Sequence, residues 1–215
     1  STLFGQYGID CAQTEVVHSA QEAVRAAQKL TGPVVLKVLS SEIVHKSEVG
    51  GVRLGLTAES LPKAFDQMVT DVRTHTGIHA DSFIIQPMLR APVELIVGMH
   101  RDPLGTALMV GMGGVTAELM NDSVLSLMPP GKVISREQAL DLLQQLKSWP
   151  LLDGYRSKPK LDVNAAIDAI IGFSTLLASL GDRLLEAEMN PLLVMEAGQS
   201  AIAADAVVIL APKEI

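Results

Sequence analysis

The sequence predicts a protein of mixed α and β structure, built as two α+β lobes. The order of helix-like and strand-like segments carries this prediction, because hairpins occur beside longer crossovers. The length of 215 residues is enough for two small lobes or one large domain with a sizeable core. Hydrophobic residues make up 48% of the chain and the mean hydropathy is +0.31, which is typical of a folded protein.

The first part of the chain combines two amphipathic helices with three strands. Ser19 and Glu22 have the spacing of a capping box at the start of the first helix. Ser60 precedes the second helix as its N-cap, and the apolar residues that follow recur every three or four positions. We predict a helix over residues 19–30, strands over 33–39 and 52–56, a helix over 60–75 and a strand over 82–88.

The remainder of the chain contains a predicted hairpin, a capped helix and a long apolar helix. Arg101 to Leu104 favour a tight turn, and Ser135 with Gln138 forms a second capping box. The apolar segment 165–181 is short for a membrane span and contains Asp168, so we interpret it as a core helix. We predict strands over 93–100 and 105–112, helices over 135–149 and 163–180, and strands over 183–190, 191–195 and 201–210.

Composition disfavours some classes of function. The net charge is -7 and aromatic residues are only 3%, whereas nucleic-acid binding usually needs a basic surface and stacking side chains. We therefore expect no nucleic-acid partner, and no membrane partner either. Cys11 is the single cysteine, so no internal disulfide can form. Together with the lack of a signal peptide at the start, this indicates a cytoplasmic location.

A lysine and a histidine close in sequence suggest phosphate chemistry. Lys37 stands in the apolar run PVVLKVL, where burial would be costly without a partner; the alternative is a strand's solvent face. His45 has a reference pKa of about 6.5, so much of it is neutral and nucleophilic at pH 7. Lys46 could hold phosphate oxygens, Glu48 could orient the ring, and the following glycines would let backbone approach a ligand. The alternative is an ordinary hairpin.

A second polar cluster lies near the end of the chain. Glu188 and Asn190 are two residues apart on a predicted strand, so their side chains share one face. Asp205 follows on the next strand and could face them. A site with few carboxylates, in which substrate phosphates complete the ligand shell of the metal, suits Mg²⁺. The alternative is a solvated sheet face that ends at Pro191.

Taken in order, these segments resemble a known family. The segments are YGI, PVVLKV, HKSEVGGVRLGL, ELIVGMHRDPLG, GMGGVTAEL, EMNPL and ADAVV. They resemble the ATP-grasp domain of ADP-forming acyl-CoA synthetases, which include the β subunit of ADP-forming acetyl-CoA synthetase and, more distantly, that of succinyl-CoA synthetase. The resemblance implies an ATP-grasp fold in which two lobes clasp a nucleotide. It implies a small nucleotide-lid lobe over about 16–88 and a larger magnesium-binding lobe over 89–215.

The resemblance also implies roles for particular residues. His45 matches the histidine that takes a phosphoryl group from a phosphohistidine of a CoA-binding partner and gives it to ADP, and Glu188 lies near the metal site as a second catalytic residue. The implied cofactors are ATP or ADP and Mg²⁺. The residues expected to contact nucleotide are Lys37, Val44, Lys46, Gln86, Met88 and Glu94, with Gln86 and Met88 at the adenine hinge; those expected to bind metal are Asn190 and Asp205.

The implied function is phosphoryl transfer in an ADP-forming acyl-CoA ligase. The chain starts with Ser1 and shows no CoA-binding or ligase domain, so we expect a separate β subunit or part of a longer polypeptide. We expect the complete enzyme to be an oligomer with CoA-binding and ligase domains. One alternative is a regulatory ATP-grasp module of an acyl-CoA synthetase-like protein acetyltransferase. Another is a ligase that uses an acyl-phosphate without a phosphohistidine.

Overall fold

The computed structural model describes residues 2–40, 42–43, 46–102, 105–114 and 121–212. The chain divides into two compact units. The smaller unit is Gln13–Leu89, and the larger unit combines Ser1–Ala12 with Arg90–Ile215. Each unit has its own hydrophobic core, and each is described by itself below.

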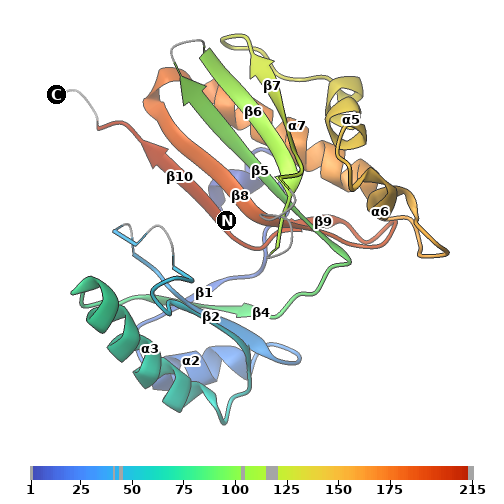
Figure 1. The fold of residues 1–215 in the computed structure, drawn as a ribbon. Coiled ribbons are helices and arrows are strands. Elements are labelled where there is room, and N and C mark those ends of the chain that lie inside the picture. Colours follow the sequence, from blue (N-terminus) through green and yellow to red (C-terminus); the bar gives the residue numbers. More distant parts are fainter. Residues whose placement is uncertain (1, 41, 44–45, 103–104, 115–120, 213–215) are drawn as a thin grey trace. The chain divides into compact units, whose positions relative to one another are not determined.

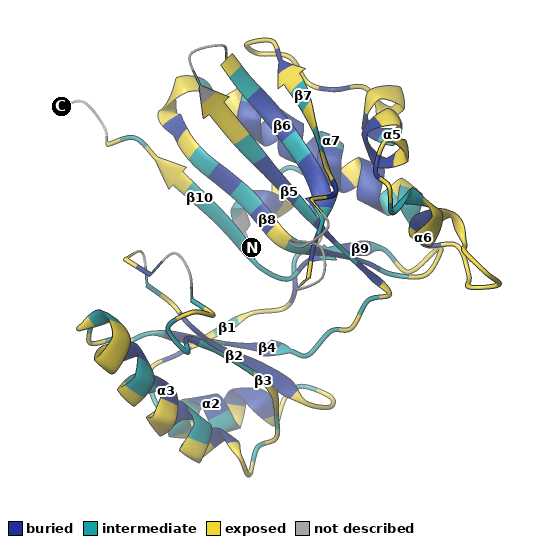
Figure 2. Ribbon diagram, in the orientation of Figure 1, coloured by how far each residue is buried: buried dark blue, intermediate teal, exposed yellow. Residues whose placement is uncertain are grey.

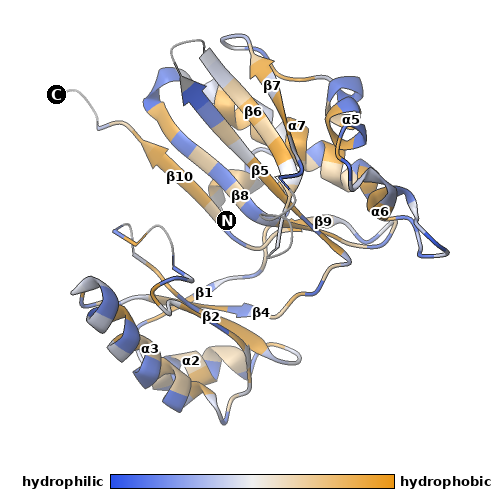
Figure 3. Ribbon diagram, in the orientation of Figure 1, coloured by the Kyte–Doolittle hydropathy of each residue, from blue (hydrophilic) through white to orange (hydrophobic). Residues whose placement is uncertain are grey.

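The smaller unit is a four-stranded antiparallel sheet with helices on one face (Figure 1). The strand order is β1-β4-β2-β3, so β2 and β4 are inner strands. Hydrophilic residues of α3 lie on its outer side, away from the sheet (Figure 3). The elements are β1 (Glu15–Val17), α2 (Ala20–Ala27), β2 (Val34–Val38), β3 (Val52–Leu56), α3 (Leu61–Thr76) and β4 (Phe83–Pro87).

The inner strand β2 is buried along its whole length (Figure 2). Val34, Leu36 and Val38 belong to the core beneath α2 and α3. Because successive side chains of a strand alternate between faces, Val35 and Lys37 point to the face away from these helices. The register pairs Lys37 with Ile84 of β4.

The helix starts use three different arrangements. The predicted capping box of Ser135 is confirmed: its Oγ accepts the Gln138 N–H, and its own N–H donates to Gln138 Oε1 at 2.8 Å. At α2, Ser19 Oγ accepts the Glu22 N–H, but Glu22 accepts from the His18 N–H and not from Ser19. Ser60 is the N-cap of α3 without a capping side-chain bond, because its hydroxyl is used in the turn with Thr57.

The larger unit is a six-stranded antiparallel sheet in the order β10-β8-β5-β6-β7, with β9 added to β8. Helices α5 and α7 pack on one face of this sheet (Figure 1). The elements are α1 (Thr2–Gly5), β5 (Val93–Asp102), β6 (Gly105–Met112), β7 (Ser123–Met128), α5 (Arg136–Gln144), α6 (Trp149–Asp153), α7 (Val163–Leu180), the 3₁₀ turn η1 (Gly181–Arg183), β8 (Leu184–Val194), β9 (Ala201–Ala203) and β10 (Ala206–Leu210).

Residues 2–12 are held to the rest of the larger unit by backbone and side-chain hydrogen bonds. The Ala203 N–H donates to the Asp10 carbonyl at 2.8 Å, and the Ala12 N–H donates to the Ala203 carbonyl at 2.9 Å. The hydroxyl groups of Tyr7 and Ser179 are hydrogen-bonded at 2.6 Å. The N-terminal segment is therefore separated in sequence from the rest of its unit by the whole smaller unit.

Helix α7 is the central core helix of the larger unit. Ile170, Phe173 and Leu176 are fully buried in the core against the sheet. Among the described residues, Val163–Arg183 is the one segment long and apolar enough to cross a membrane, with a mean hydropathy of 1.6. Half of that window is buried inside the protein, and a single helix of this kind is weak evidence for a membrane span.

Asp162 joins the start of α7 to the turn between β8 and β9. Its Oδ1 accepts the Ala165 N–H at 3.1 Å, and its Oδ2 accepts the N–H groups of Gly198 at 2.9 Å and Ser200 at 3.1 Å. Burial by itself would raise the pKa of Asp162. The backbone hydrogen bonds outweigh burial, so the pKa lies below that of an ordinary aspartate.

We expect Asp162→Asn to lower the free energy of unfolding at pH 7 by about 1–3 kcal/mol. Asparagine caps a helix as well as aspartate does, but its NH₂ group would face the Gly198 and Ser200 donors. Because the folded-state pKa is lowered, the stabilisation is complete above the unfolded pKa of about 3.9 and is lost as the pH falls through the folded pKa. Urea unfolding should show the difference shrinking below about pH 4. If the wild type and Asp162→Asn differed in free energy of unfolding by the same amount at pH 7 and below about pH 4, this account would be contradicted.

Candidate functional site

Lys37 is buried on an inner strand of the smaller unit. Only 8% of the residue is exposed, so the alternative of a solvated strand face is wrong. Its neighbours across the sheet are Val52 on β3 and Ile84 on β4. With little water around it, an ammonium group at this place would interact strongly with an anion.

Gln86 lies near the end of β4, and Met88, the other residue predicted at the adenine hinge, directly follows this strand. Gln86 is 8% exposed and pairs with Val35, so it shares with Lys37 the face away from the helices. Its Nε2 donates to Thr14 Oγ1 at 3.0 Å, which fixes the side-chain amide. The Met88 N–H donates to the Pro33 carbonyl at 2.9 Å and ends the strand pairing. Thr14 is a contact that sequence patterns did not indicate, since 72 residues separate it from Gln86.

The loop between β2 and β3 is tightly closed at its end. The Gly51 N–H donates to the Lys46 carbonyl at 2.7 Å, and the Gly51 carbonyl accepts the Val38 N–H at 2.8 Å. A Cβ on Gly51 would lie 2.6 Å from Val38 Cγ1, so the close approach requires glycine. This gives Lys46 a defined backbone position. The predicted site residues Val44 and His45 lie outside the described residues, and Glu48 is exposed.

The larger unit brings three predicted site residues together. Glu188 and Asn190 alternate with Ala187 and Met189, which are buried in the core against α7. Glu188 and Asn190 therefore share the face of β8 away from α7. The Asn190 N–H donates to the Asp205 carbonyl at 3.0 Å, so these two residues are direct neighbours across the strands.

These oxygen-bearing side chains fit a magnesium ion. Asp205 Oδ1 accepts the Ala206 N–H at 2.9 Å, which holds the carboxylate at the start of β10. Within the described part of the chain, no group of three or more His, Cys, Asp or Glu residues could enclose a metal by itself. Mg²⁺ is commonly bound by one or two protein groups, with phosphates and water completing its shell. Asn190 and Asp205 carry one amide oxygen and one carboxylate, which are ligands of the kind that Mg²⁺ takes.

Glu94 is placed at the start of β5 by the glycines that follow β6. Its carbonyl accepts the Gly113 N–H at 2.8 Å. A Cβ on Gly113 would lie 3.2 Å from Glu94 Cβ and 3.3 Å from the Glu94 carbonyl oxygen. Glycine at this position thus lets the backbone pack against Glu94. The start of the GMGGVTAEL segment therefore has a packing role beside Glu94.

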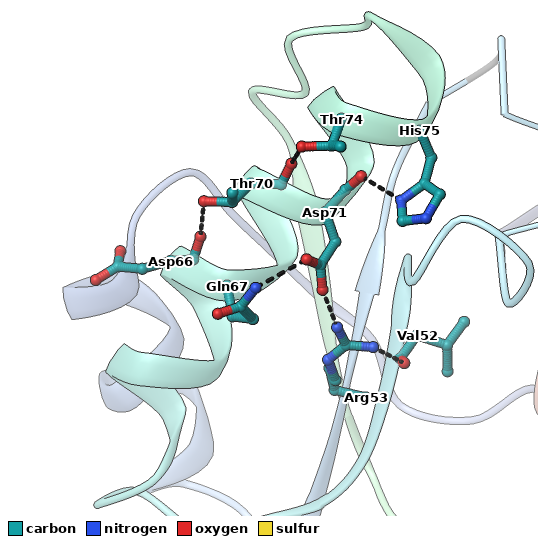
Figure 4. Close-up of polar contacts among 8 residues, drawn as sticks. All are labelled: Val52, Arg53, Asp66, Gln67, Thr70, Asp71, Thr74 and His75. Carbon is teal, nitrogen blue, oxygen red and sulfur yellow. Dashed lines mark hydrogen bonds and ion pairs between the residues drawn. The ribbon is translucent and has the colours of Figure 1, made fainter.

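A polar cluster in the smaller unit was missed by sequence reasoning. Arg53 of β3 forms an ion pair with Asp71 of α3, and Gln67 donates to the same carboxylate at 2.8 Å (Figure 4). The two charged residues are 18 positions apart, on different elements, and no local pattern joins them. Asp71 Cβ packs beside Gly50, at the end of the loop that begins after β2.

The comparison with known families identifies the fold. A model of the ATP-grasp domain matches residues 1–210. This chain belongs to the ATP-grasp family. The fold class and the family resemblance predicted from the sequence are both confirmed. The two units, each with its own antiparallel sheet and helices, are the form that the ATP-grasp fold takes in this chain.

Relatives of this ATP-grasp chain include ADP-forming ligases. The β subunit of acetate–CoA ligase (ADP-forming) I from Pyrococcus furiosus is 35% identical over 208 residues, covering 95% of this chain and 86% of that subunit. Acetate–CoA ligase (ADP-forming) I from Archaeoglobus fulgidus is 34% identical over 198 residues. That match covers 91% of this chain but only 28% of the relative, so the chain spans less than a third of the longer protein.

The ATP-grasp chain also matches solved structures of acetyl-coenzyme A synthetase 1 from Ca. Korarchaeum cryptofilum. The complex with coenzyme A and Ca-AMPCP has a TM-score of 0.85 and 30% identity, over 98% of this chain and 90% of that chain. A complex with coenzyme A and Mg-AMPPCP, with its phosphohistidine segment pointing towards the nucleotide-binding site, has a TM-score of 0.76 and 29% identity, over 98% and 89% of the two chains.

Proposed function

We propose that this chain is the nucleotide-binding, phosphoryl-transfer part of an ADP-forming acyl-CoA synthetase, an acid–thiol ligase. The observation that carries the proposal is similarity over nearly the whole chain to a β subunit of such a ligase. The buried Lys37 and the adjacent Asn190 and Asp205 agree with it, since an ammonium group attracts phosphate oxygens and amide and carboxylate oxygens suit the Mg²⁺ that accompanies a nucleotide. The net reaction would be acyl-CoA + ADP + phosphate ⇌ carboxylic acid + CoA + ATP. No specific observation favours a regulatory module over this function.

We assign the carrier step to His45. A lone pair on its neutral imidazole forms a P–N bond to the phosphoryl group of a partner's phosphohistidine, while the original P–N bond breaks and the partner ring keeps that electron pair. A β-phosphate oxygen of ADP then forms a P–O bond as the P–N bond to His45 breaks. ATP leaves, and His45 returns to a free imidazole.

The remaining residues bind and orient the nucleotide. Lys37 and Lys46 would neutralise phosphate charge, with backbone at Val44 and Lys46 close to the phosphates. Mg²⁺, held by Asn190 and Asp205, would supply further charge neutralisation when bound. Glu188, on the same face as Asn190, would orient water around the phosphates. The adenine would lie against Gln86 and Met88, and Glu94 would contact the nucleotide from the larger unit.

The proposed partner is a CoA-binding and ligase part, on a separate subunit or in the same longer chain. The phosphohistidine segment of the Korarchaeum enzyme, which points towards its nucleotide site in one complex, supports this choice. We propose an oligomeric complete enzyme and a cytoplasmic location. The single cysteine, which allows no internal disulfide, is compatible with that location.

The proposed function is tested by calorimetry and by phosphate transfer. We expect ADP and ATP to bind this chain with Mg²⁺ and to bind much more weakly when EDTA removes the metal. A purified CoA-binding domain carrying labelled phosphohistidine should then pass its label to the chain as an acid-labile phosphoprotein. Nucleotide binding without transfer would exclude the phosphohistidine relay and favour an acyl-phosphate ligase. No metal-dependent binding would exclude a functional nucleotide site.

A further inference from the structure

The turn that follows His45 is packed against a charged pair that has no part in the chemistry proposed above. Gly50 has a positive φ of 71° and its N–H donates to the Ser47 carbonyl at 3.3 Å. A Cβ at Gly50 would lie 3.2 Å from Asp71 Cβ and 3.4 Å from Arg53 Nη2. Gly50, in the turn from Lys46 to Gly51, therefore packs against the Arg53–Asp71 pair.

The pair is itself fixed at both ends (Figure 4). Arg53 Nη2 donates to Asp71 Oδ2, and its Nη1 donates to the Val52 carbonyl at 3.3 Å. Gln67, one turn before Asp71 on α3, donates to Asp71 Oδ1 at 2.8 Å. The carboxylate thus has one oxygen bonded to its own helix and the other to strand β3. This arrangement ties the helix and the strand together at the place where the loop returns to the sheet.

The far end of the same loop is also anchored. Ile43 is 5% exposed and belongs to the core of the smaller unit, and Val49 packs against that core. The two residues between Ile43 and Lys46 include His45. The described residues that flank positions 44 and 45 are therefore both anchored, Ile43 in the core and Lys46 through the bond from its carbonyl to the Gly51 N–H.

We propose that Arg53 and Asp71 are positioning residues that fix the turn after His45 and so aim the imidazole for phosphoryl transfer. This inference rests on the proposed carrier role of His45. The side chains of Arg53 and Asp71 are only 32% and 24% exposed, so the pair is partly shielded from water. Losing the pair would shift the turn, and a misplacement of about 1 Å can cost a reaction about a hundredfold.

The test compares Asp71→Asn and Arg53→Met with a matched control in the full-length protein. Lys29→Met removes another ion pair of the smaller unit, Lys29 with Glu15, whose side chains are 64% and 44% exposed. Each variant is incubated with Mg²⁺ and γ-labelled ATP, and the rate of acid-labile labelling of His45 is measured. The Kd for Mg·ADP and the Tm are measured in parallel.

We expect Asp71→Asn and Arg53→Met to slow labelling at least about tenfold with little change in the Kd for Mg·ADP. Lys29→Met should label like the wild type. Arg53→Lys keeps the charge but loses the bond to the Val52 carbonyl, so it should recover part of the rate. If Asp71→Asn and Arg53→Met were both labelled at the wild-type rate, the inference would be overturned. It would also be overturned if Lys29→Met slowed labelling as much as these two variants do.

A second measurement separates failure of this inference from failure of the proposed function. Hydrogen exchange reports on the Gly51 N–H, which is bonded to the Lys46 carbonyl. We expect its exchange to be at least about tenfold faster in Asp71→Asn than in the wild type or Lys29→Met. Unchanged exchange overturns the positioning role whatever the activity. If Asp71→Asn exchanges faster but the wild type is not labelled at all, the pair still packs against the turn. It then has no role in phosphoryl transfer, and the inference as stated is overturned.

Discussion

Replacing His45 with asparagine should abolish turnover and the acid-labile phosphoprotein while nucleotide binding survives. Asparagine has no nitrogen able to form a P–N bond, so the phosphoryl group has no acceptor on this chain. We expect the rate of the complete enzyme to fall by at least about a thousandfold, as when other covalent nucleophiles are removed. Lys37, Asn190 and Asp205 are unchanged, so the Kd for Mg·ADP should stay near that of the wild type.

His79→Asn is a suitable control for this variant. His79 is an exposed histidine of the same unit, between α3 and β4, and we assign it no part in the site. The two variants have the same change of composition, so only the position differs. If His45→Asn turns over at the rate of His79→Asn, the carrier role of His45 is wrong, although the ATP-grasp fold and its nucleotide site would stand.

Asp205→Asn should weaken metal-dependent nucleotide binding by about 10–100-fold. The variant removes a negative charge from a site proposed to hold Mg²⁺ but keeps an oxygen that can accept the Ala206 N–H. The strand should therefore remain in place. Calorimetry with ADP at increasing Mg²⁺ concentration should show that the variant needs more metal to reach the same affinity, and turnover should fall in parallel.

The matched control for Asp205→Asn is Glu186→Gln. Glu186 lies two residues before Glu188 on the same strand and loses one negative charge in the same way. General electrostatic attraction of Mg²⁺ to an acidic surface would affect both variants equally. Equal loss of affinity in the two variants, or none in either, would show that Asp205 does not bind the metal.

Local sequence patterns predicted most helices and strands, because helix caps and hydrophobic periods depend on nearby residues. The capping box of Ser135 and the span of α7 are confirmed. The short elements α1, β1 and α6 were missed, since a few residues carry little periodicity. The edge strand β7 was missed as well, because Leu125 and Leu127 are exposed and no buried run marks it. The two strands predicted over 183–195 form the single strand β8.

The candidate site was predicted from the sequence only as a set of residues and not as an arrangement. Lys37, and Glu188 with Asn190, were predicted as site residues because they are polar residues in apolar strands. The ordered motifs suggested their roles. Their roles stay predictions. The burial of Lys37 and the contact of Asn190 with Asp205 depend on strand register, which a single strand's sequence does not specify.

The sequence by itself determined the family, the main elements and the residue types at the site, because each of these follows from short stretches of chain. Only the tertiary structure decided which distant residues are in contact. Arg53 forms an ion pair with Asp71, Gln86 donates a hydrogen bond to Thr14, and Asp162 accepts hydrogen bonds from the turn at Gly198 and Ser200. The physical reason is that these hydrogen bonds and ion pairs need two elements packed at one register, and neither partner carries that information alone.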